Sequence, residues 1–377
     1  MKESVVATDV SVAMEQGASI ERIGVERLLR AKSAYTTRRI DKLLARQIIR
    51  GDVAPVSGDL VLAKVERIGQ HKRLELEHGR RAPLFIGDEV VVCYGNRYAP
   101  DQFEAEVPRN LDACHLVAAG GVASQCLSRH QNIQAPTLLQ PIGLLADEEG
   151  RRINLNQWAL PTPQSALGLS LRPLVIVVVG TAMNAGKTTS AAHLIRGLNL
   201  SGLKVGAAKL TGTGAGGDVW LMKDAGAERV YDFTDAGFVS TYRSFPHELE
   251  TIANKLVGHL KQDGAEAIVL EIADGLLQTE TSSLLRSSRF RSMIDGVLFA
   301  AGDAMGAHNG VQWLRNRELP VIGVSGCVSA SPLAAREAAK VTNLPVFDLD
   351  ELGSPDISTQ LLESCGKWIA RAQQASQ

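Results

Sequence analysis

The C-terminal half of the chain alternates between short apolar runs and longer stretches with an apolar residue at every third or fourth position. The short runs predict buried strands, and the longer spacing predicts helices that pack one face on a core. Strands are expected at 173–179, 203–208, 229–233, 267–272, 295–301, 320–325 and 345–348. Helices are expected at 187–200, 218–226, 246–262, 306–317, 332–342 and 356–373. Helices between buried strands are typical of βαβ units, so we predict an α/β fold with a mostly parallel sheet flanked by helices.

The N-terminal part has a different pattern. Residues 19–50 carry apolar side chains at helical spacing, which predicts helices. Two Gly-Asp pairs, at 58–59 and 87–88, each precede an apolar run of similar sequence. A turn before each run predicts short antiparallel strands, and we expect a small β-barrel-like part here. The arrangement of residues 111–156, which hold apolar and glycine-rich segments, does not follow from the pattern.

A change in composition separates these two parts. Residues 156–171 contain Pro161 and Pro163 and are typical of a linker. We therefore expect an N-terminal domain over 1–160, helical and β-rich, that binds a substrate or partner. A second domain is expected over 171–377, and a chain of 377 residues is long enough for both.

The charge of the chain is nearly balanced, with 40 basic and 41 acidic residues and a net charge of −1. Such a balance gives no general attraction to nucleic acid or to an anionic membrane. Residues 22–50 are rich in Arg and Lys, which hints at nucleic acid. A solvated helix face is the plainer interpretation, so we expect no nucleic-acid partner.

Cysteine usage and the apolar runs indicate the compartment. Five cysteines are scattered without a Cys-x-x-Cys pair, which is typical of a reducing environment. The first residues lack the basic segment and apolar core of a signal peptide. The apolar runs are too short to span a bilayer. We expect a soluble, cytoplasmic protein with no membrane partner.

The clearest candidate for a binding site follows the first strand of the C-terminal half. Residues 175–179 are all Val or Ile, and a loop of small residues then leads to Gly186, Lys187 and Thr188 before a helix-forming stretch. Backbone N–H groups of such a loop bind phosphate, the lysine contacts the β- and γ-phosphates, and the hydroxyl binds Mg²⁺. An ordinary strand–turn–helix is the plainer alternative, but the flanking strand and helix are the context that the motif requires.

This loop is one residue longer than usual. Five residues separate its first glycine from Gly186, where the usual motif has four, and a threonine stands at the usual first glycine. The candidate nucleotide-binding residues of the loop are Gly180, Thr181, Asn184, Ala185, Gly186, Lys187, Thr188 and Thr189.

Further candidates lie where other strands of the predicted sheet end. Lys209 ends the second strand and begins a glycine-rich loop that reaches Asp218, and Glu271 ends the fourth strand. The carboxyl ends of parallel strands share one edge of the sheet, so these side chains are expected near the phosphate-binding loop. Mg²⁺ prefers oxygen ligands; Glu271 is the better candidate and Asp274 the reserve. A solvated lysine, a helix-capping aspartate and an exposed strand-end acid are the plainer alternatives.

A polar loop at residues 232–243 follows the third predicted strand. It is richer in polar side chains than a connection needs, which favours a substrate-side loop. A polar connection without function explains the same composition equally well.

With these residues in place, the segment from about 173 to 350 resembles dethiobiotin synthetase and its relatives among the P-loop NTPases. That family also has Gly-Thr, four residues and then Gly-Lys-Thr, the spacing found here from Gly180 to Thr188. It places a lysine at the end of the second strand, as Lys209 does, and a hydroxyl residue four positions later, as Thr213 does. The N-terminal 160 residues match no part of it, so we do not expect dethiobiotin synthesis itself.

The resemblance implies roles for individual residues. The Mg²⁺ ligands of the family correspond to Thr188, Asp218 and Glu271. The strand end that reads adenine corresponds to Ser325, where the family has asparagine. The family's glutamate is followed by a glycine-rich stretch, whereas here Asp274 follows after two apolar residues. Relatives build sites across a subunit interface, so the resemblance also implies a homodimer.

Two functional hypotheses follow. The first is an enzyme that uses ATP and Mg²⁺ to transfer or hydrolyse the γ-phosphate, activating a small acidic metabolite as a kinase or ligase does. Its candidate catalytic residues are Lys187, Lys209, Asp218 and Glu271. The alternative is a nucleotide-dependent switch or assembly factor, an ATPase or GTPase that acts on a protein or nucleic acid. Nucleotide consumption coupled to a small molecule distinguishes the first from the second.

Overall fold

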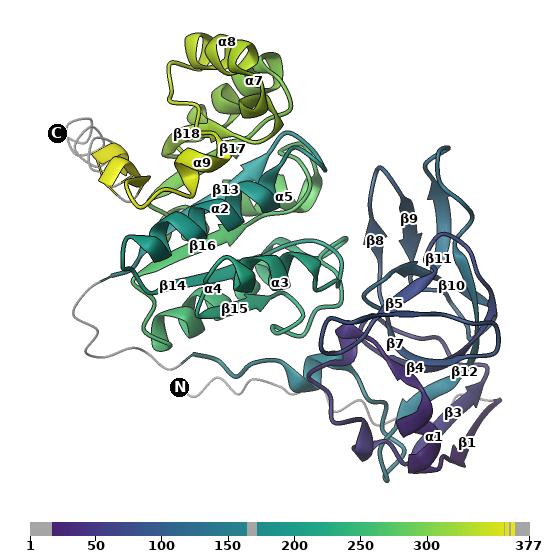
Figure 1. Cartoon of the computed structure of the whole chain (residues 1–377). Coiled ribbons are helices and arrows are strands. Elements are labelled where there is room, and N and C mark those ends of the chain that lie inside the picture. Colours follow the sequence, from purple (N-terminus) through teal and green to yellow (C-terminus); the bar gives the residue numbers. More distant parts are fainter. Residues whose placement is uncertain (1–16, 164–171, 358, 362, 366–377) are drawn as a thin grey trace. The chain divides into compact units, whose positions relative to one another are not determined.

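The computed structural model describes residues 17–163, 172–357, 359–361 and 363–365 (Figure 1). Contacts between residues divide the chain into two compact units. One contains Met1–Arg97 and Phe103–Trp158, and the other contains Tyr98–Gln102 and Ala159–Gln377. No helix in the described part of the chain is long and apolar enough to cross a membrane.

The first unit consists mainly of short strands. They are β1 (Ala18–Arg22), β2 (Lys32–Ser33), β3 (Gln47–Gly51), β4 (Leu60–Arg67), β5 (Arg73–Glu75), β6 (Arg81–Pro83), β7 (Glu89–Tyr94), β9 (Phe103–Glu106), β10 (Cys114–Ala118), β11 (Val122–Arg129) and β12 (Thr137–Ala146). The two-residue strand β8 (Arg97–Tyr98) begins in this unit, and its Tyr98 is grouped with the second unit. The helical segments are α1 (Val25–Arg30), η1 (Tyr35–Thr37), η2 (Lys42–Leu44) and η3 (Leu155–Trp158).

Five of these strands close into a ring. β12 pairs with β4, β4 with β7, β7 with β11, β11 with β10, and β10 again with β12. Each pairing is antiparallel except that of β7 with β11, which is parallel. The predicted barrel-like part is therefore confirmed, and the stretch 111–156 supplies three of its strands, β10, β11 and β12.

The helices predicted over 19–50 are wrong for most of that segment. It holds the strands β1, β2 and β3, with only the six-residue α1 and two single 3₁₀ turns between them. Ile48 and Ile49 pair with Leu145 and Leu144 of β12, so both isoleucines are buried by strand pairing. Tertiary pairing overrides the helical spacing of these apolar positions.

The two Gly-Asp turns lie at opposite ends of one strand pair. Gly58 and Gly87 both have a positive φ, of 93° and 92°, which glycine adopts without strain. The N–H of Gly58 donates to the carbonyl of Tyr94 at 2.8 Å, and the N–H of Gly87 donates to that of Val65 at 2.8 Å. The turn at Gly58 therefore holds the start of β4 against the end of β7, and the turn at Gly87 holds the start of β7 near the end of β4. Together they set the register of β4 with β7.

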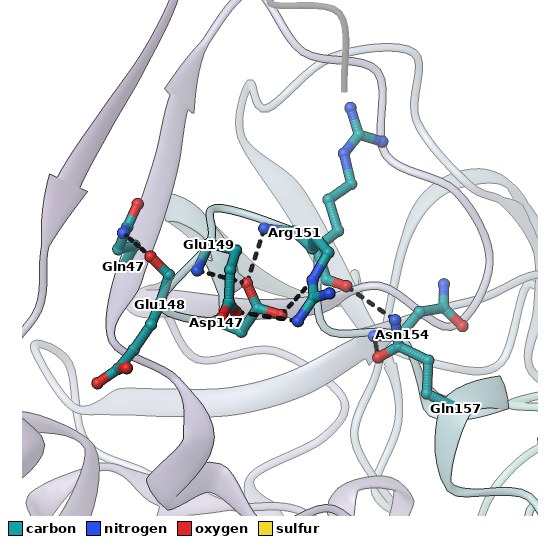
Figure 2. Close-up of polar contacts among 8 residues, drawn as sticks. Gln47, Asp147, Glu148, Glu149, Arg151, Asn154 and Gln157 are labelled. Carbon is teal, nitrogen blue, oxygen red and sulfur yellow. Dashed lines mark hydrogen bonds and ion pairs between the residues drawn. The ribbon is translucent and has the colours of Figure 1, made fainter. Parts of the chain in front are cut away.

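The turn after β12 is held by Asp147 (Figure 2). Its Oδ1 accepts hydrogen bonds from the backbone N–H groups of Glu149 at 3.0 Å and Arg151 at 2.9 Å. Its Oδ2 accepts from Nε of Arg151 at 2.7 Å, as Figure 2 shows. Burial alone would raise the pKa of Asp147, but the hydrogen bonds and the charge of Arg151 outweigh it and lower that pKa. The turn directs the chain back along β12, where Ala146 forms a bridge with Arg152.

The second unit alternates strands and helices. Its strands are β13 (Leu174–Gly180), β14 (Val205–Lys209), β15 (Arg229–Asp232), β16 (Ala267–Glu271), β17 (Gly296–Ala300) and β18 (Val321–Ser325). Its helices are α2 (Lys187–Leu200), α3 (Gly217–Asp224), α4 (Pro246–Gln262), α5 (Thr279–Arg286), α6 (Ser288–Arg291), α7 (Ala304–Arg315), η4 (Cys327–Ala330), α8 (Pro332–Thr342) and α9 (Leu349–Leu352).

These six strands form one parallel sheet in the order β15-β14-β16-β13-β17-β18. Along β13, Val175, Val177 and Val179 face a core made with α4 to α8, while Ile176 and Val178 face a core made with α2, α3 and α9. Helices cover both faces, as continuous apolar strands require. The predicted α/β fold with a mostly parallel sheet is confirmed (Figure 1).

Three details of this unit differ from the expectation. The strand predicted at 345–348 is reduced to a single bridge between Val324 and Val346. Helices α5 and α6 were not among the predicted helices. Of the helix predicted at 356–373, residue 356 is in a turn, the described residues from 357 to 365 are helical, and the last part lies outside the described residues.

Candidate nucleotide-binding site

The loop between β13 and α2 has the backbone geometry of a phosphate-binding loop. Asn184 and Gly186 have positive φ values of 63° and 94°. A Cβ on Gly186 would lie 2.8 Å from Cα of Gly326, so this position requires glycine for its space as well as for its φ. Gly186 precedes the first residue of α2, and the 14-residue helix thus presents its N-terminus to the loop. Helix N-termini attract anions through their unpaired N–H groups and dipole.

Lys187 folds back across this loop. Its Nζ donates a hydrogen bond to the carbonyl of Ala182 at 2.7 Å, and the residue is 6% exposed. Burial lowers the pKa of Lys187, while the carboxylates of Glu271 and Asp274 act in the opposite direction. The ammonium group of Lys187 is therefore hydrogen-bonded to the loop carbonyl of Ala182 and attracted by the carboxylates of Glu271 and Asp274.

Thr188 and Glu271 meet at the sheet edge. Oγ1 of Thr188 donates to Oε1 of Glu271 at 2.8 Å. Glu271 is 2% exposed, and its Oε2 is buried without a hydrogen-bond partner among the described residues. Burial and the charge of Asp218 raise the pKa of Glu271 to about 7, against the opposing effects of Lys209, Thr188 and Lys187. A buried carboxylate with an open oxygen is a strong site for a cation.

Lys209 and Asp218 form an ion pair beside this carboxylate. Lys209 ends β14 and is in register with Glu271, the last residue of β16. Asp218 lies in the first turn of α3, at the far end of the glycine-rich loop. Burial alone would lower the pKa of Lys209, but the charges of Asp218 and Glu271 raise it above its usual value. The lysine is therefore fully charged at the strand ends.

The structure thus brings together all the candidate catalytic and metal-binding residues, Lys187, Thr188, Lys209, Asp218 and Glu271. The parallel register explains why, because Val178 of β13 and Lys209 of β14 both pair with Glu271. Strand ends that are far apart in the sequence become neighbours at one edge. Thr181 is partly exposed and Asn184 and Thr189 are exposed, whereas Ala185 is buried.

Ser325 ends β18, at the strand end to which the resemblance assigns adenine recognition. Its side chain is fully buried at the end of β18, within hydrogen-bond distance of Oγ of Ser190 on α2 at 3.2 Å. The contact between the two hydroxyls joins the end of β18 to α2. The next residues support the loop from the side, since the N–H of Cys327 donates to the carbonyl of Ala185 at 3.1 Å.

The polar loop at 232–243 supports the loop that follows β14. Asp232 is fully buried, and its Oδ1 accepts from the N–H of Thr234 at 2.8 Å. Thr241 exchanges hydrogen bonds with Gly212, whose N–H donates to Oγ1 of Thr241 at 2.9 Å and whose carbonyl accepts from its N–H at 2.9 Å. The contacts with Gly212 tie this segment to the glycine-rich loop that leads to Asp218.

Thr211 and Thr281, which the sequence pattern does not mark, hold the backbone beside Glu271. Oγ1 of Thr211 accepts from the N–H of Ala273 at 2.9 Å, and Oγ1 of Thr281 donates to the carbonyl of Ala273 at 2.9 Å. The two hydroxyls fix the chain directly after Glu271. No sequence signal marks them: Thr211 bonds to backbone 62 positions away, and Thr281 bonds to backbone eight positions before it.

A parallel sheet whose central strand enters a glycine loop and a helix that begins Lys-Thr defines the fold of a P-loop NTPase. Such proteins bind nucleotides at this loop. Neither the scan of protein-family models nor the search of curated proteins finds a match for the chain.

Solved structures that are similar to this chain include a signal recognition particle protein and two FtsY proteins. The signal recognition particle 54 kDa protein from Aeropyrum pernix, in complex with GDP, is 20% identical with a TM-score of 0.35, over 59% of this chain and 54% of that one. The signal recognition particle receptor FtsY from Elizabethkingia anophelis is 16% identical with a TM-score of 0.34, over 52% and 66%. Chloroplast FtsY from Physcomitrella patens is 18% identical with a TM-score of 0.36, over 56% and 70%. The match spans about half the length of the first of these proteins.

Proposed function

We propose that the second unit binds a nucleoside triphosphate with Mg²⁺ and transfers or hydrolyses its γ-phosphate. The observation that carries this proposal is the pairing of Thr188 with Glu271, 2.8 Å apart at the end of the phosphate-binding loop. Neighbouring ligands of an octahedral Mg²⁺ with bonds of 2.0–2.1 Å are separated by about 2.9 Å. The hydroxyl and carboxylate oxygens therefore have the spacing of two adjacent ligands.

The donor set also suits Mg²⁺. Among the described residues, no group of three or more His, Cys, Asp or Glu side chains could hold a metal ion by itself. Mg²⁺ does not need one, because it binds one or two carboxylates and completes its shell with water and nucleotide phosphates. Thr188 and Glu271 would hold the ion, with Asp218 beside them, and the ion would neutralise charge on the β- and γ-phosphates.

Two buried lysines supply the remaining positive charge. Lys187 and Lys209 are 6% and 9% exposed. Phosphoryl transfer depends mainly on positioning and on neutralising the charge of the moving group, and buried charges act more strongly than solvated ones. Lys187 would contact the bound phosphates. Lys209 is paired with Asp218, and the bound phosphates would compete with that carboxylate for its ammonium group. Lys209 would then stabilise the transferred group.

The loop spacing and Lys209 support a dethiobiotin synthetase-like enzyme, and we infer that the acceptor is a small, acidic metabolite. We propose ATP as the nucleotide. The first unit is proposed to bind a substrate or partner. The resemblance to dethiobiotin synthetase also leads us to propose a homodimer. The proposed domain boundaries are 1–160 and 171–377. The alternative is a switch or assembly factor that uses ATP or GTP. Its hydrolysis would be stimulated by a protein or nucleic acid.

The test measures phosphate release from MgATP and MgGTP by the full chain, alone and with pools of small acids. Lys187→Ala should abolish turnover and leave the melting temperature within a few degrees. Lys204→Ala, a lysine before β14 and away from the loop, is the matched control and should be fully active. Full activity of Lys187→Ala would refute the proposal. Stimulation by a protein or nucleic acid, with none by a small molecule, would favour the switch.

A further inference from the structure

The segment after β16 is locked in an unusual backbone conformation. Both backbone groups of Ala273 are held, its N–H by Oγ1 of Thr211 and its carbonyl by Oγ1 of Thr281, each at 2.9 Å. The next residue, Asp274, has a φ of 64°. A non-glycine residue with a positive φ is uncommon and costs free energy, and such residues concentrate at functional sites. The surrounding hydrogen bonds maintain this conformation.

The following glycine presses the segment against the phosphate-binding loop. A Cβ on Gly275 would lie 2.2 Å from the carbonyl oxygen of Thr181 and 3.1 Å from Cα of Ala182. The N–H of Gln278 then donates to the carbonyl of Gly275 at 3.1 Å, which closes the turn before α5. Asp274 therefore cannot move away from the first residues of the phosphate-binding loop without breaking several contacts.

A small cavity lies at this junction. Thr181, Ala182 and Met183 line it from the phosphate-binding loop, and Asp274 and Gln278 line it from the segment after β16. The negative charge of Asp274 acts on Lys187, whose Nζ is bonded to Ala182. The aspartate thus shares a cavity with the part of the loop over which the lysine of the phosphate site is folded.

We propose that this cavity is the acceptor subsite and that Asp274 is the general base that takes a proton from the attacking group. This inference rests on the proposed function and specifies its chemistry. An oxygen or nitrogen of the acceptor forms a bond to the γ-phosphorus while the bond to the β,γ-bridging oxygen breaks. The bridging oxygen keeps the bonding electrons and leaves with the nucleoside diphosphate. The acceptor's proton passes to the carboxylate of Asp274 and from there to solvent.

This arrangement defines the class of acceptor. A hydroxyl, an amine or water has a proton to give to Asp274. A carboxylate has none at neutral pH, and its charge would lie against the charge of Asp274 at the reacting end. The product is therefore a phosphate ester, a phosphoramidate or inorganic phosphate. An acidic metabolite suits the subsite if it reacts through a hydroxyl or amine.

The test compares Asp274→Asn with Asp224→Asn, an exposed aspartate at the end of α3. Asparagine tolerates a positive φ as well as aspartate does, so the substitution removes the base and keeps the backbone. Calorimetry with MgATP gives the Kd, and phosphate release from MgATP, with water as acceptor, gives kcat and its pH profile. Asp274→Asn should bind MgATP within about threefold of the unaltered chain, release phosphate on the order of 100-fold more slowly, and lose the acidic limb of the pH profile. Asp224→Asn should match the unaltered chain.

Several results would overturn the inference. Unchanged kcat in Asp274→Asn would show that no proton passes to this residue, and a loss of MgATP binding would show that it only shapes the loop. Hydroxamate formed when hydroxylamine is added with dicarboxylic acids would reveal an acyl phosphate, and hence a carboxylate acceptor. If the unaltered chain neither binds nor hydrolyses nucleotide, the proposed function itself fails, which is a different result from an active Asp274→Asn.

Discussion

The hydroxyl of Thr188 donates a 2.8 Å hydrogen bond to the carboxylate of Glu271, a residue 83 positions further along the chain. The hydroxyl lies at the start of α2 and the carboxylate at the end of β16, so the bond joins a helix N-terminus to the edge of the sheet. The parallel register that places β16 beside β13 makes this contact possible. The two oxygens that we propose as Mg²⁺ ligands thereby lie side by side at the start of α2.

Glu271→Gln should separate metal binding from folding. The carboxylate is buried and its Oε2 has no partner among the described residues, so a neutral amide removes a costly buried charge. We expect a melting temperature equal to or above that of the unaltered chain. The Mg²⁺ concentration that gives half-maximal phosphate release should rise at least tenfold.

Thermal shift and Mg²⁺ titrations measure both effects. Glu228→Gln, which changes an exposed carboxylate of the same unit, is the control and should alter neither quantity. A Glu271→Gln protein that melts lower and keeps the normal Mg²⁺ requirement would mean that Glu271 serves the fold alone.

Gly275→Ala should damage the phosphate site through sterics. The new Cβ would lie 2.2 Å from the carbonyl oxygen of Thr181, a distance at which the backbone must move. Overpacking of this kind costs about 1–3 kcal/mol, so we expect a lower melting temperature and at least tenfold weaker nucleotide binding. Calorimetry and thermal melts check both.

Gly302→Ala is the matched control, because a Cβ there meets nothing within 4 Å. It should behave as the unaltered chain does. Equal nucleotide affinity in the two variants would show that the contact between Gly275 and Thr181 does not hold the loop.

The first unit should lose stability in mild acid through His71. Burial, together with the charge of Arg97, lowers the pKa of His71 to about 4. The unfolded chain binds a proton near the ordinary pKa of 6.5, so stability is complete above pH 6.5 and falls as the pH drops toward 4. At about 1.4 kcal/mol per pKa unit, the loss reaches about 3 kcal/mol.

An NMR titration of the His71 ring protons gives its pKa directly, and melts at pH 7 and pH 5 give the stability change. His71→Gln should flatten the pH dependence, whereas the exposed His78→Gln should not. A His71 that titrates near 6.5 would contradict the expectation.

Much of the second unit could be predicted from the sequence because its strands are continuous apolar runs, each followed by an amphipathic helix. Lys209 and Glu271 could be found because parallel strands bring their carboxyl ends to one edge. Asp274 was recognised only as a reserve metal ligand. No local pattern reveals its φ of 64° or the hydrogen bonds by which the hydroxyls of Thr211 and Thr281 hold Ala273.

The first unit was predicted less well. Strands β4 and β7 carry Gly-Asp turns that mark where each begins, but β1 and β3 have no such mark. Ile48 and Ile49 are adjacent and both buried, a pattern equally compatible with a helix until the pairing with β12 is known. At the site, the contact of Ser325 with Ser190 could not be predicted either, since a strand end alone does not fix the direction of a side chain.

The most direct measurement is calorimetry of ATP binding with and without Mg²⁺, for the unaltered chain, Thr188→Ser and Thr188→Val. Serine keeps the hydroxyl beside Glu271, and valine keeps the shape of threonine without it. We predict that Mg²⁺ tightens ATP binding at least tenfold in the unaltered chain and in Thr188→Ser, and that Thr188→Val loses this gain. Equal affinity with and without Mg²⁺ in the unaltered chain, or a full gain in Thr188→Val, would contradict a metal site formed by Thr188 and Glu271.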